Sequence, residues 1–184
     1  MNRALIIVDV QNDFIEGGAL PVTGGNKIAY YIDDYVQKWG GQYDAIVATA
    51  DDHEEGSDNG GHFSMFPDFK DSWPVHCVRG TPGSSLHKRI DELPLDSVFY
   101  KGHGRPDYSG FQGTNEDGKE LSTWLIDNDI TDIDVVGIAG EHCVRATALD
   151  GKRFGFNVRI LPEYVASIGG TEATLKVIEE LDRA

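Results

Sequence analysis

The stretch Asp132-Ile-Asp-Val-Val-Gly-Ile-Ala-Gly-Glu-His-Cys-Val-Arg-Ala-Thr-Ala-Leu-Asp150 predicts a buried strand followed directly by a helix. Its apolar run, Val135 to Ile138, is typical of a strand in a parallel sheet. The small residues that follow allow a tight reversal, so we expect a helix over 143–154 with Cys143 near its N-terminus. Unpaired N–H groups and the helix dipole at such a position lower the pKa of a thiol. By position alone, Cys143 is compatible with a nucleophile or with a buried structural cysteine.

Two other apolar strands end in charged residues. The run from Ala4 to Val8 is followed by Asp9, and Val98-Phe-Tyr leads into Lys101. A lysine at a strand end is commonly a solvated residue, so a functional role for Lys101 is indicated only in combination with Asp9 and Cys143. In open α/β sheets the carboxyl edge is where ligands bind. An acid, a cation and a thiol at this edge are the groups that covalent acyl transfer requires.

Strand and helix patterns alternate along the whole chain. This alternation predicts an α/β fold with three layers, in which a doubly wound, mostly parallel sheet has helices on both faces. There is no repeat or linker, so we expect one domain over residues 1–184. The expected strands are 3–9, 43–49, 97–101, 133–138 and 156–161, and the expected helices are 24–38, 118–128, 143–154 and 171–182.

Composition limits the possible partners. The chain has 184 residues, 40% of them hydrophobic, and a formal net charge of −15. This acidity argues against binding to nucleic acid or to an anionic membrane surface, because both bind protein surfaces that are rich in Lys and Arg. No apolar run approaches the roughly 20 residues of a membrane span, and no secretory leader follows Met1. Two cysteines are too few for a disulfide scaffold, so we expect a cytoplasmic protein, as a monomer or homo-oligomer.

The long irregular segment from residue 50 to residue 96 is rich in metal-ligand side chains. Irregular segments of this length in compact domains are usually functional. Three imidazoles and a carboxylate converging from one segment predict a site for a divalent transition metal ion, with zinc as the first choice and iron or manganese as alternatives. These ligands are Asp51, His53, His62 and His76. Cys77 is a weaker candidate, because neighbouring side chains in extended backbone point apart.

Several of these motifs together resemble the nicotinamidases of the isochorismatase-like cysteine hydrolases. The resemblance runs from Ala4 to about Leu181. The motifs that carry it are Ile7-Val-Asp-Val-Gln-Asn-Asp-Phe14, Asp51-x-His53, Trp73-Pro-Val-His76, Val98-Phe-Tyr-Lys-Gly102, Tyr108-Ser-Gly-Phe111 and Val135-Val-Gly-Ile-Ala139 followed by His142-Cys-Val144. The metal-ligand set is the part that resembles nicotinamidases in particular.

The resemblance implies an isochorismatase-like fold and a role for each site residue. Asp9, Lys101 and Cys143 would form a catalytic triad, with the Ile138–Ala139 peptide bond in the cis form. The N–H groups of Ala139 and Cys143 would form an oxyanion hole. The substrate would be nicotinamide, hydrolysed to nicotinate and ammonia in NAD salvage, with pyrazinamide also accepted. A flat aromatic ring would lie among Phe14, Trp73 and Tyr108.

His142 is open to two interpretations, substrate contact or packing beside the nucleophile, whereas we expect His87 and His103 to lie outside the site. The sequence also departs from the family. Asp52 replaces an aromatic residue, a glycine-rich insert lengthens the interval between His53 and His62, and Gly140 replaces a residue that is commonly threonine. The final edge strand of the family is expected to be absent or very short.

Other functions remain open from the sequence. A metal-free amidase of the same superfamily would act on another small amide. A vinyl-ether hydrolase resembling isochorismatase would not use the cysteine. A non-enzymatic ligand-binding or thiol redox domain would be expected to carry a glycine-rich phosphate loop or a Cys-x-x-Cys pair, and neither motif occurs in the sequence.

Overall fold

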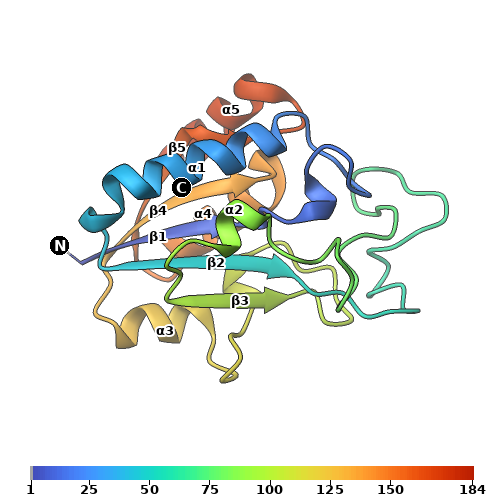
Figure 1. Ribbon diagram of the computed structural model, residues 1–184, viewed down its shortest axis with the longest axis horizontal. Helices are drawn as coiled ribbons and strands as arrows, with labels where there is room; N and C mark the ends of the chain where they lie inside the picture. The colour runs from blue at the N-terminus through green and yellow to red at the C-terminus, as the bar shows by residue number, and fades with distance from the viewer. Residues whose placement is uncertain (1) are drawn as a thin grey trace.

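The computed structural model describes residues 2–184, and the centre of this part of the chain is a five-stranded sheet (Figure 1). Its strands are β1 (Arg3–Val8), β2 (Ala45–Asp51), β3 (Ser97–Lys101), β4 (Asp132–Ile138) and β5 (Asn157–Ala166). They lie in the order β3-β2-β1-β4-β5, and every neighbouring pair is parallel. The predicted mostly parallel sheet is therefore confirmed, and it is parallel throughout.

Helices cover both faces of the sheet, as the three-layer prediction requires. On one face lie α1 (Gly25–Trp39) and α2 (Lys88–Asp91), and on the other lie α3 (Leu121–Asp127), α4 (Arg145–Arg153) and α5 (Gly170–Arg183). Successive side chains of β1 alternate between the two cores, because strand residues point to opposite faces. Leu5 packs in the core that contains Ile32 of α1, whereas Ile6 packs in the core that contains Leu125 of α3.

Several predicted boundaries differ from those in the structure. The predicted strand 156–161 is longer, because Val165 and Ala166 pair with β4 beyond a shift in register. Pro162 hides this continuation in the sequence, although proline is tolerated in an edge strand such as β5. The predicted strand 43–49 is instead β2, which extends to Asp51. Within residues 2–184 no strand follows α5, and no helix has the length and apolar character needed to cross a membrane.

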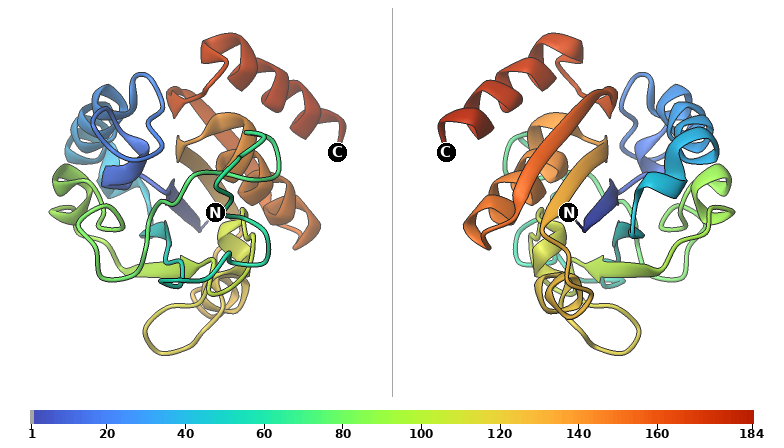
Figure 2. Two further views of the ribbon diagram at one scale, coloured as in Figure 1. Left: turned by 90° about the vertical axis from the view of Figure 1, so that its right-hand side faces the viewer. Right: turned by 90° about the vertical axis from the view of Figure 1, so that its left-hand side faces the viewer.

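The arrows of β2, β3 and β4 point to the right in Figure 1, and the sheet is parallel, so the carboxyl ends of its strands lie on that side. Viewed from that side, the irregular segment between β2 and α2 crosses in front of the sheet (Figure 2, left). The strand order reverses between β1 and β4, so the residues after these two strands, Asp9 and Ala139, flank the topological switch point. Ligands bind at this position in open α/β sheets.

Candidate active site

Asp9 lies immediately after β1, with a left-handed backbone (φ +49°), and its side chain is fully buried. Its Oδ1 accepts a hydrogen bond from Thr49 Oγ1 at 2.6 Å, and Lys101 Nζ lies 2.9 Å from its Oδ2. Burial raises the pKa of Asp9, although the positive charge of Lys101 opposes this effect. A carboxylate with a raised pKa is suited to accept and return a proton near neutral pH.

Lys101 is the last residue of β3, and it is not a solvated strand-end lysine. Its side chain is buried, and its ammonium group pairs with the carboxylates of both Asp9 and Asp51. Nζ also lies 3.9 Å from the Sγ atom of Cys143. Burial opposes the charged form, but Asp51 and Asp9 outweigh it and raise the pKa of Lys101 well above its ordinary value. The two carboxylates therefore favour the charged form of Lys101, which lies between them.

The structure corrects the predicted start of the helix at Cys143. A π-helical turn spans Gly140–Val144, and α4 follows it, so the helical segment begins three residues earlier than expected. The expected low thiol pKa was wrong as well. Cys143 is buried, and its burial raises the thiol pKa well above the ordinary value, although Lys101 opposes this shift. A thiol in this environment needs a base to remove its proton, and Asp9 is close enough to influence its pKa.

The peptide bond between Ile138 and Ala139 is cis, which confirms the expectation from the resemblance. Ala139 lies in the connection between β4 and the π-helical turn, where it lines the same pocket as Cys143. The structure thus brings together the two residues predicted to supply oxyanion-hole N–H groups.

An apolar pocket lies beside these groups, and aromatic residues form much of its wall. The four predicted substrate-binding residues, Phe14, Trp73, Tyr108 and His142, all line it. Trp73 Nε1 donates a hydrogen bond to the Tyr108 hydroxyl at 2.9 Å, and the ring centroids of Trp73 and His142 are 5.1 Å apart. Burial lowers the pKa of His142, which favours a neutral imidazole in this wall.

Four further lining residues were not predicted from the sequence: Leu20, Pro21, Val22 and Ile168. They lie in the connections after β1 and β5, at the same edge of the sheet. Only their position after strand ends could have indicated that they line the pocket, because aliphatic side chains do not mark a functional site in a sequence. They extend the apolar wall that a flat ring would contact.

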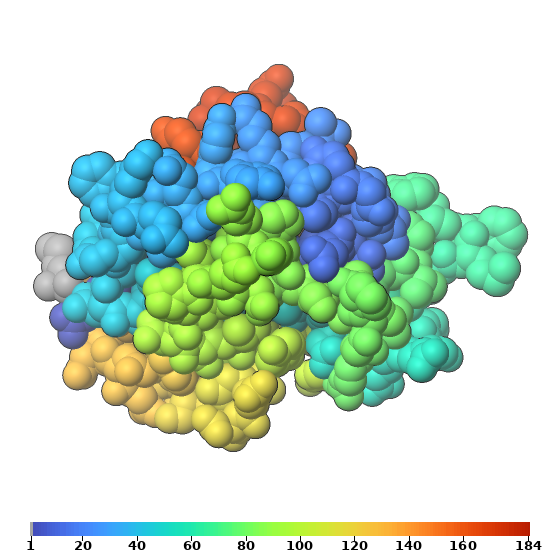
Figure 3. Space-filling view, in the orientation of Figure 1, coloured from blue at the N-terminus to red at the C-terminus, as the bar shows by residue number. Residues whose placement is uncertain are grey.

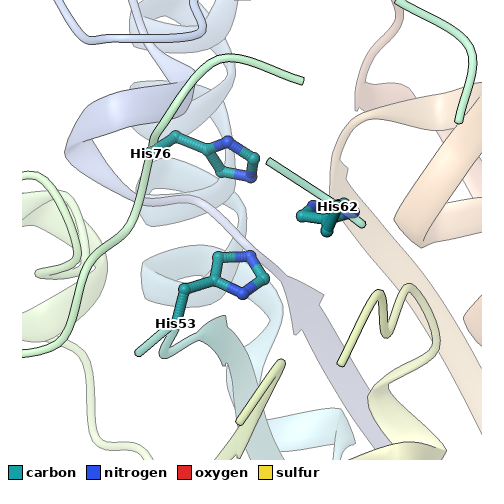
Figure 4. Close-up of side chains that lie close together, drawn as sticks. All are labelled: His53, His62 and His76. Atoms are coloured by element: carbon teal, nitrogen blue, oxygen red, sulfur yellow. The ribbon is translucent and has the colours of Figure 1, made fainter. Parts of the chain in front are cut away.

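The imidazoles of His53, His62 and His76 form a buried cluster beside the pocket (Figure 4). One ring nitrogen of each lies within 4.8 Å of the corresponding atoms of the other two. His53 Nδ1 is 3.0 Å from the Gly102 carbonyl oxygen, and His76 Nδ1 is 2.7 Å from the Pro74 carbonyl oxygen. These carbonyls favour a proton on Nδ1, which leaves each Nε2 lone pair free to bind a metal ion.

The cluster fits a divalent transition metal ion. Among residues 2–184, His53 Nε2 and His62 Nδ1 are buried without a hydrogen-bond partner, an arrangement that is costly unless another group binds them. Burial, assisted by the neighbouring imidazoles, lowers the pKa of His62 to about 3, so the ring is neutral as a ligand must be. Three imidazoles are a donor set that suits zinc and related ions.

Asp51 lies at the edge of this cluster, with one carboxylate oxygen near the imidazoles and the other near Lys101. Its Oδ2 is 3.5 Å from His53 Nε2 and 3.8 Å from His76 Nε2, while its Oδ1 pairs with Lys101. Burial opposes ionisation of Asp51, but Lys101 and the neighbouring imidazoles outweigh it and hold its pKa below the usual range. Asp51 therefore links the imidazole cluster to the charged pair formed by Lys101 and Asp9.

The unusual Asp52 does not enter the cluster. It accepts a hydrogen bond from Arg79 Nε at 2.8 Å at the surface, where His103 also lies. Cys77 is buried, with its Sγ directed to the carbonyl oxygen of Gly83 at 3.9 Å, and it is absent from the described imidazole cluster. His87 lies at the start of α2, where its ring accepts a hydrogen bond from the Arg89 N–H.

Two buried amide side chains support the cluster and were not predicted from the sequence. Gln11 holds the backbone of Asp51, because its Oε1 accepts from the Asp51 N–H and its Nε2 donates to the Asp51 carbonyl oxygen, each at 2.8 Å. Asn59 ties the glycine-rich insert together: its Oδ1 accepts from the N–H groups of Glu54 and Gly104. The insert is therefore an ordered connection that leads into His62.

The Isochorismatase domain model matches residues 3–182, so the chain belongs to the isochorismatase family. It is 47% identical over 182 residues to a nicotinamidase/pyrazinamidase of Mycobacterium tuberculosis, covering 99% of this chain and 95% of that protein. The structure of the pyrazinamidase of Pyrococcus horikoshii in complex with zinc has 37% sequence identity and a TM-score of 0.80 over 100% of this chain and 96% of that chain. The yeast nicotinamidase bound to the inhibitor nicotinaldehyde has 28% identity and a TM-score of 0.82 over 98% and 96% of the respective chains. The predicted resemblance and fold are confirmed.

Proposed function

We propose that this chain hydrolyses the carboxamide of nicotinamide to give nicotinate and ammonia, and that it also accepts pyrazinamide. One observation carries the proposal: Asp9, Lys101 and Cys143 lie together in a buried group, and Cys143 also lines an aromatic-walled pocket that borders the buried imidazole cluster. The bacterial and yeast relatives are a nicotinamidase/pyrazinamidase and a nicotinamidase, which supports the same substrate.

Cys143 is the nucleophile in this proposal, and Asp9 is the general base. Asp9 removes the thiol proton as Sγ attacks the carboxamide carbon, and the N–H groups of Ala139 and Cys143 hold the resulting oxyanion. Each such donor contributes about 2.7–4 kcal/mol in measured oxyanion holes. Asp9 then gives the proton to the leaving nitrogen, and ammonia departs. Water attacks the thioester and Asp9 accepts its proton. The adduct then collapses to nicotinic acid and the Cys143 thiolate, Asp9 returns the proton to the thiolate, and nicotinic acid ionises to nicotinate.

Lys101 keeps Asp9 in place and ionised before the attack, because its ammonium lies 2.9 Å from the Asp9 carboxylate. The aromatic wall of Phe14, Trp73 and Tyr108 orients the flat ring, and His142 packs against that wall. Holding the carboxamide beside Sγ contributes to the rate by replacing a chance encounter with a fixed geometry.

His53, His62 and His76, with Asp51 beside them, would hold a divalent metal ion, for which we propose zinc, with iron or manganese as alternatives. When bound, the ion supplies a Lewis acid that orients the substrate through its ring nitrogen. We place the reaction in the cytoplasm, because the nucleophile must stay reduced, and both Cys77 and Cys143 are free thiols.

The test is ammonia release from nicotinamide by the purified protein and by its Cys143→Ala variant, together with metal analysis of both. Wild-type protein should release ammonia, and the variant should retain its fold and metal but lose turnover. Residual activity of more than a few per cent would refute the covalent mechanism. Wild-type activity without bound metal would favour a metal-free amidase.

A further inference from the structure

The connection between β5 and α5 forms part of the pocket wall through Ile168. This residue lines the pocket, yet it is 59% exposed. It follows an edge strand, so the sheet holds it from one side only. Contacts from elsewhere must therefore fix its position relative to Cys143.

Glu141 supplies such a contact. Its Oε2 accepts a hydrogen bond from the Ile168 N–H at 3.0 Å, and its Oε1 accepts one from the Gly169 N–H at 2.7 Å. A carboxylate that binds two consecutive N–H groups forms charge-assisted hydrogen bonds with a defined direction. Glu141 itself lies in the π-helical turn, two residues before Cys143. The carboxylate thus joins the pocket wall to the turn that carries the thiol.

Close packing surrounds this contact. A Cβ atom at Gly140 would lie 1.9 Å from Ser167 Oγ, so the turn and the connection approach more closely than any larger residue at position 140 would allow. Ser167 Oγ is in turn 2.7 Å from Thr174 Oγ1 of α5. The backbone next to Ile168 is therefore held from both sides, by Glu141 on the turn and by Thr174 on the helix.

We propose that Glu141 is a positioning residue that sets the affinity for the substrate ring by fixing Ile168 in the pocket wall. This inference rests on the proposed amidase function. Without the carboxylate, the connection must be ordered each time a ring binds, and this cost raises KM. The groups that make and break bonds are untouched, so kcat should change little.

A double-mutant cycle tests the inference with Glu141→Ala, Ile168→Ala and the double variant, using ammonia release from nicotinamide. Each single change should raise KM by about 2- to 10-fold, in line with the cost of ordering one side chain. The double variant should resemble Ile168→Ala, because coupled residues are not additive. Glu172→Ala is the matched control, since Glu172 is an exposed acid near the start of α5 that pairs with Lys176.

Hydrogen exchange of the peptide that covers residues 167–170 provides a readout without substrate. Exchange should be faster in Glu141→Ala than in wild-type protein and unchanged in Glu172→Ala. Glu141→Gln retains one acceptor oxygen, so it should give intermediate exchange and an intermediate KM, and it serves if Glu141→Ala does not fold.

Multiplicative KM effects, or unchanged exchange at residues 167–170, would overturn the proposal. The double variant is also compared with Ile168→Ala alone. If adding Glu141→Ala lowers kcat and shifts the pH profile, the proposal is overturned, because Glu141 would then act through His142 or Cys143. If wild-type protein releases no ammonia, the amidase function fails, whereas the exchange measurement still decides whether Glu141 orders the connection.

Discussion

Replacing Gly102 with alanine should displace His53 and so lower both metal affinity and folding stability. Gly102 follows β3 with φ +85°, and a Cβ atom there would lie 2.6 Å from His53 Cε1 and 2.7 Å from His53 Nδ1. The same residue's carbonyl oxygen orients the His53 ring. The substitution therefore pushes on a proposed metal ligand and disturbs the hydrogen bond that sets its tautomer.

The expected loss of stability has two parts. A left-handed alanine costs about 1–2 kcal/mol, and overpacking a buried site costs about 1–3 kcal/mol more. Gly155→Ala isolates the first part, because Gly155 has φ +92° but, apart from its own chain neighbours, no residue of the described part of the chain lies within 4 Å of the added Cβ. The free energy of unfolding in urea should thus fall further for Gly102→Ala, with a Tm difference between the two variants of about 2–12 °C.

A measurement of metal affinity distinguishes two effects of the substitution, backbone strain alone and displacement of a metal ligand. Perturbing the groups that orient a ligand typically lowers metal affinity by about 10- to 100-fold. Titration with zinc should show this loss for Gly102→Ala and none for Gly155→Ala. If both variants bind zinc like the wild type and unfold at the same urea concentration, alanine at position 102 does not displace His53 and the reasoning is refuted.

Three further outcomes are expected. Because burial raises the pKa of Asp9 and the base must be deprotonated, kcat/KM should fall with decreasing pH through an acid limb above about 3.9, the ordinary aspartate value; a limb at or below that value contradicts the assignment of Asp9. Lys101→Met should lower the free energy of unfolding by about 3–5 kcal/mol, because it leaves buried carboxylates unpaired; a loss below 1 kcal/mol in urea denaturation would contradict the buried ion pair. Benzamide, which lacks the ring nitrogen, should be a poorer substrate than nicotinamide by up to ~10⁴ in kcat/KM, while pyrazinamide is turned over; equal rates on benzamide and nicotinamide would exclude the ring-nitrogen role.

The positions of the reactive groups could be predicted from local sequence alone. Asp9, Lys101 and Cys143 each follow or end an apolar run, and parallel strands place their carboxyl ends at one edge of a sheet. The spacing of Asp51 and His53, with two more histidines in the same irregular segment, likewise indicated a metal site. The structure brings the three strand-end residues together and clusters the three histidines, because strand periodicity and ligand type are properties of short stretches of chain.

Tertiary structure alone decided the environments of those groups. Position near a helix N-terminus predicted a lowered thiol pKa for Cys143, yet burial raises it, because desolvation depends on every segment that covers the residue. The support of Asp51 by Gln11 and the wall contributed by Ile168 join residues far apart in the chain, and neither side chain has a chemical signature in the sequence. Local patterns therefore determine which groups reach the sheet edge, whereas long-range packing determines their charge, their partners and the shape of the pocket around them.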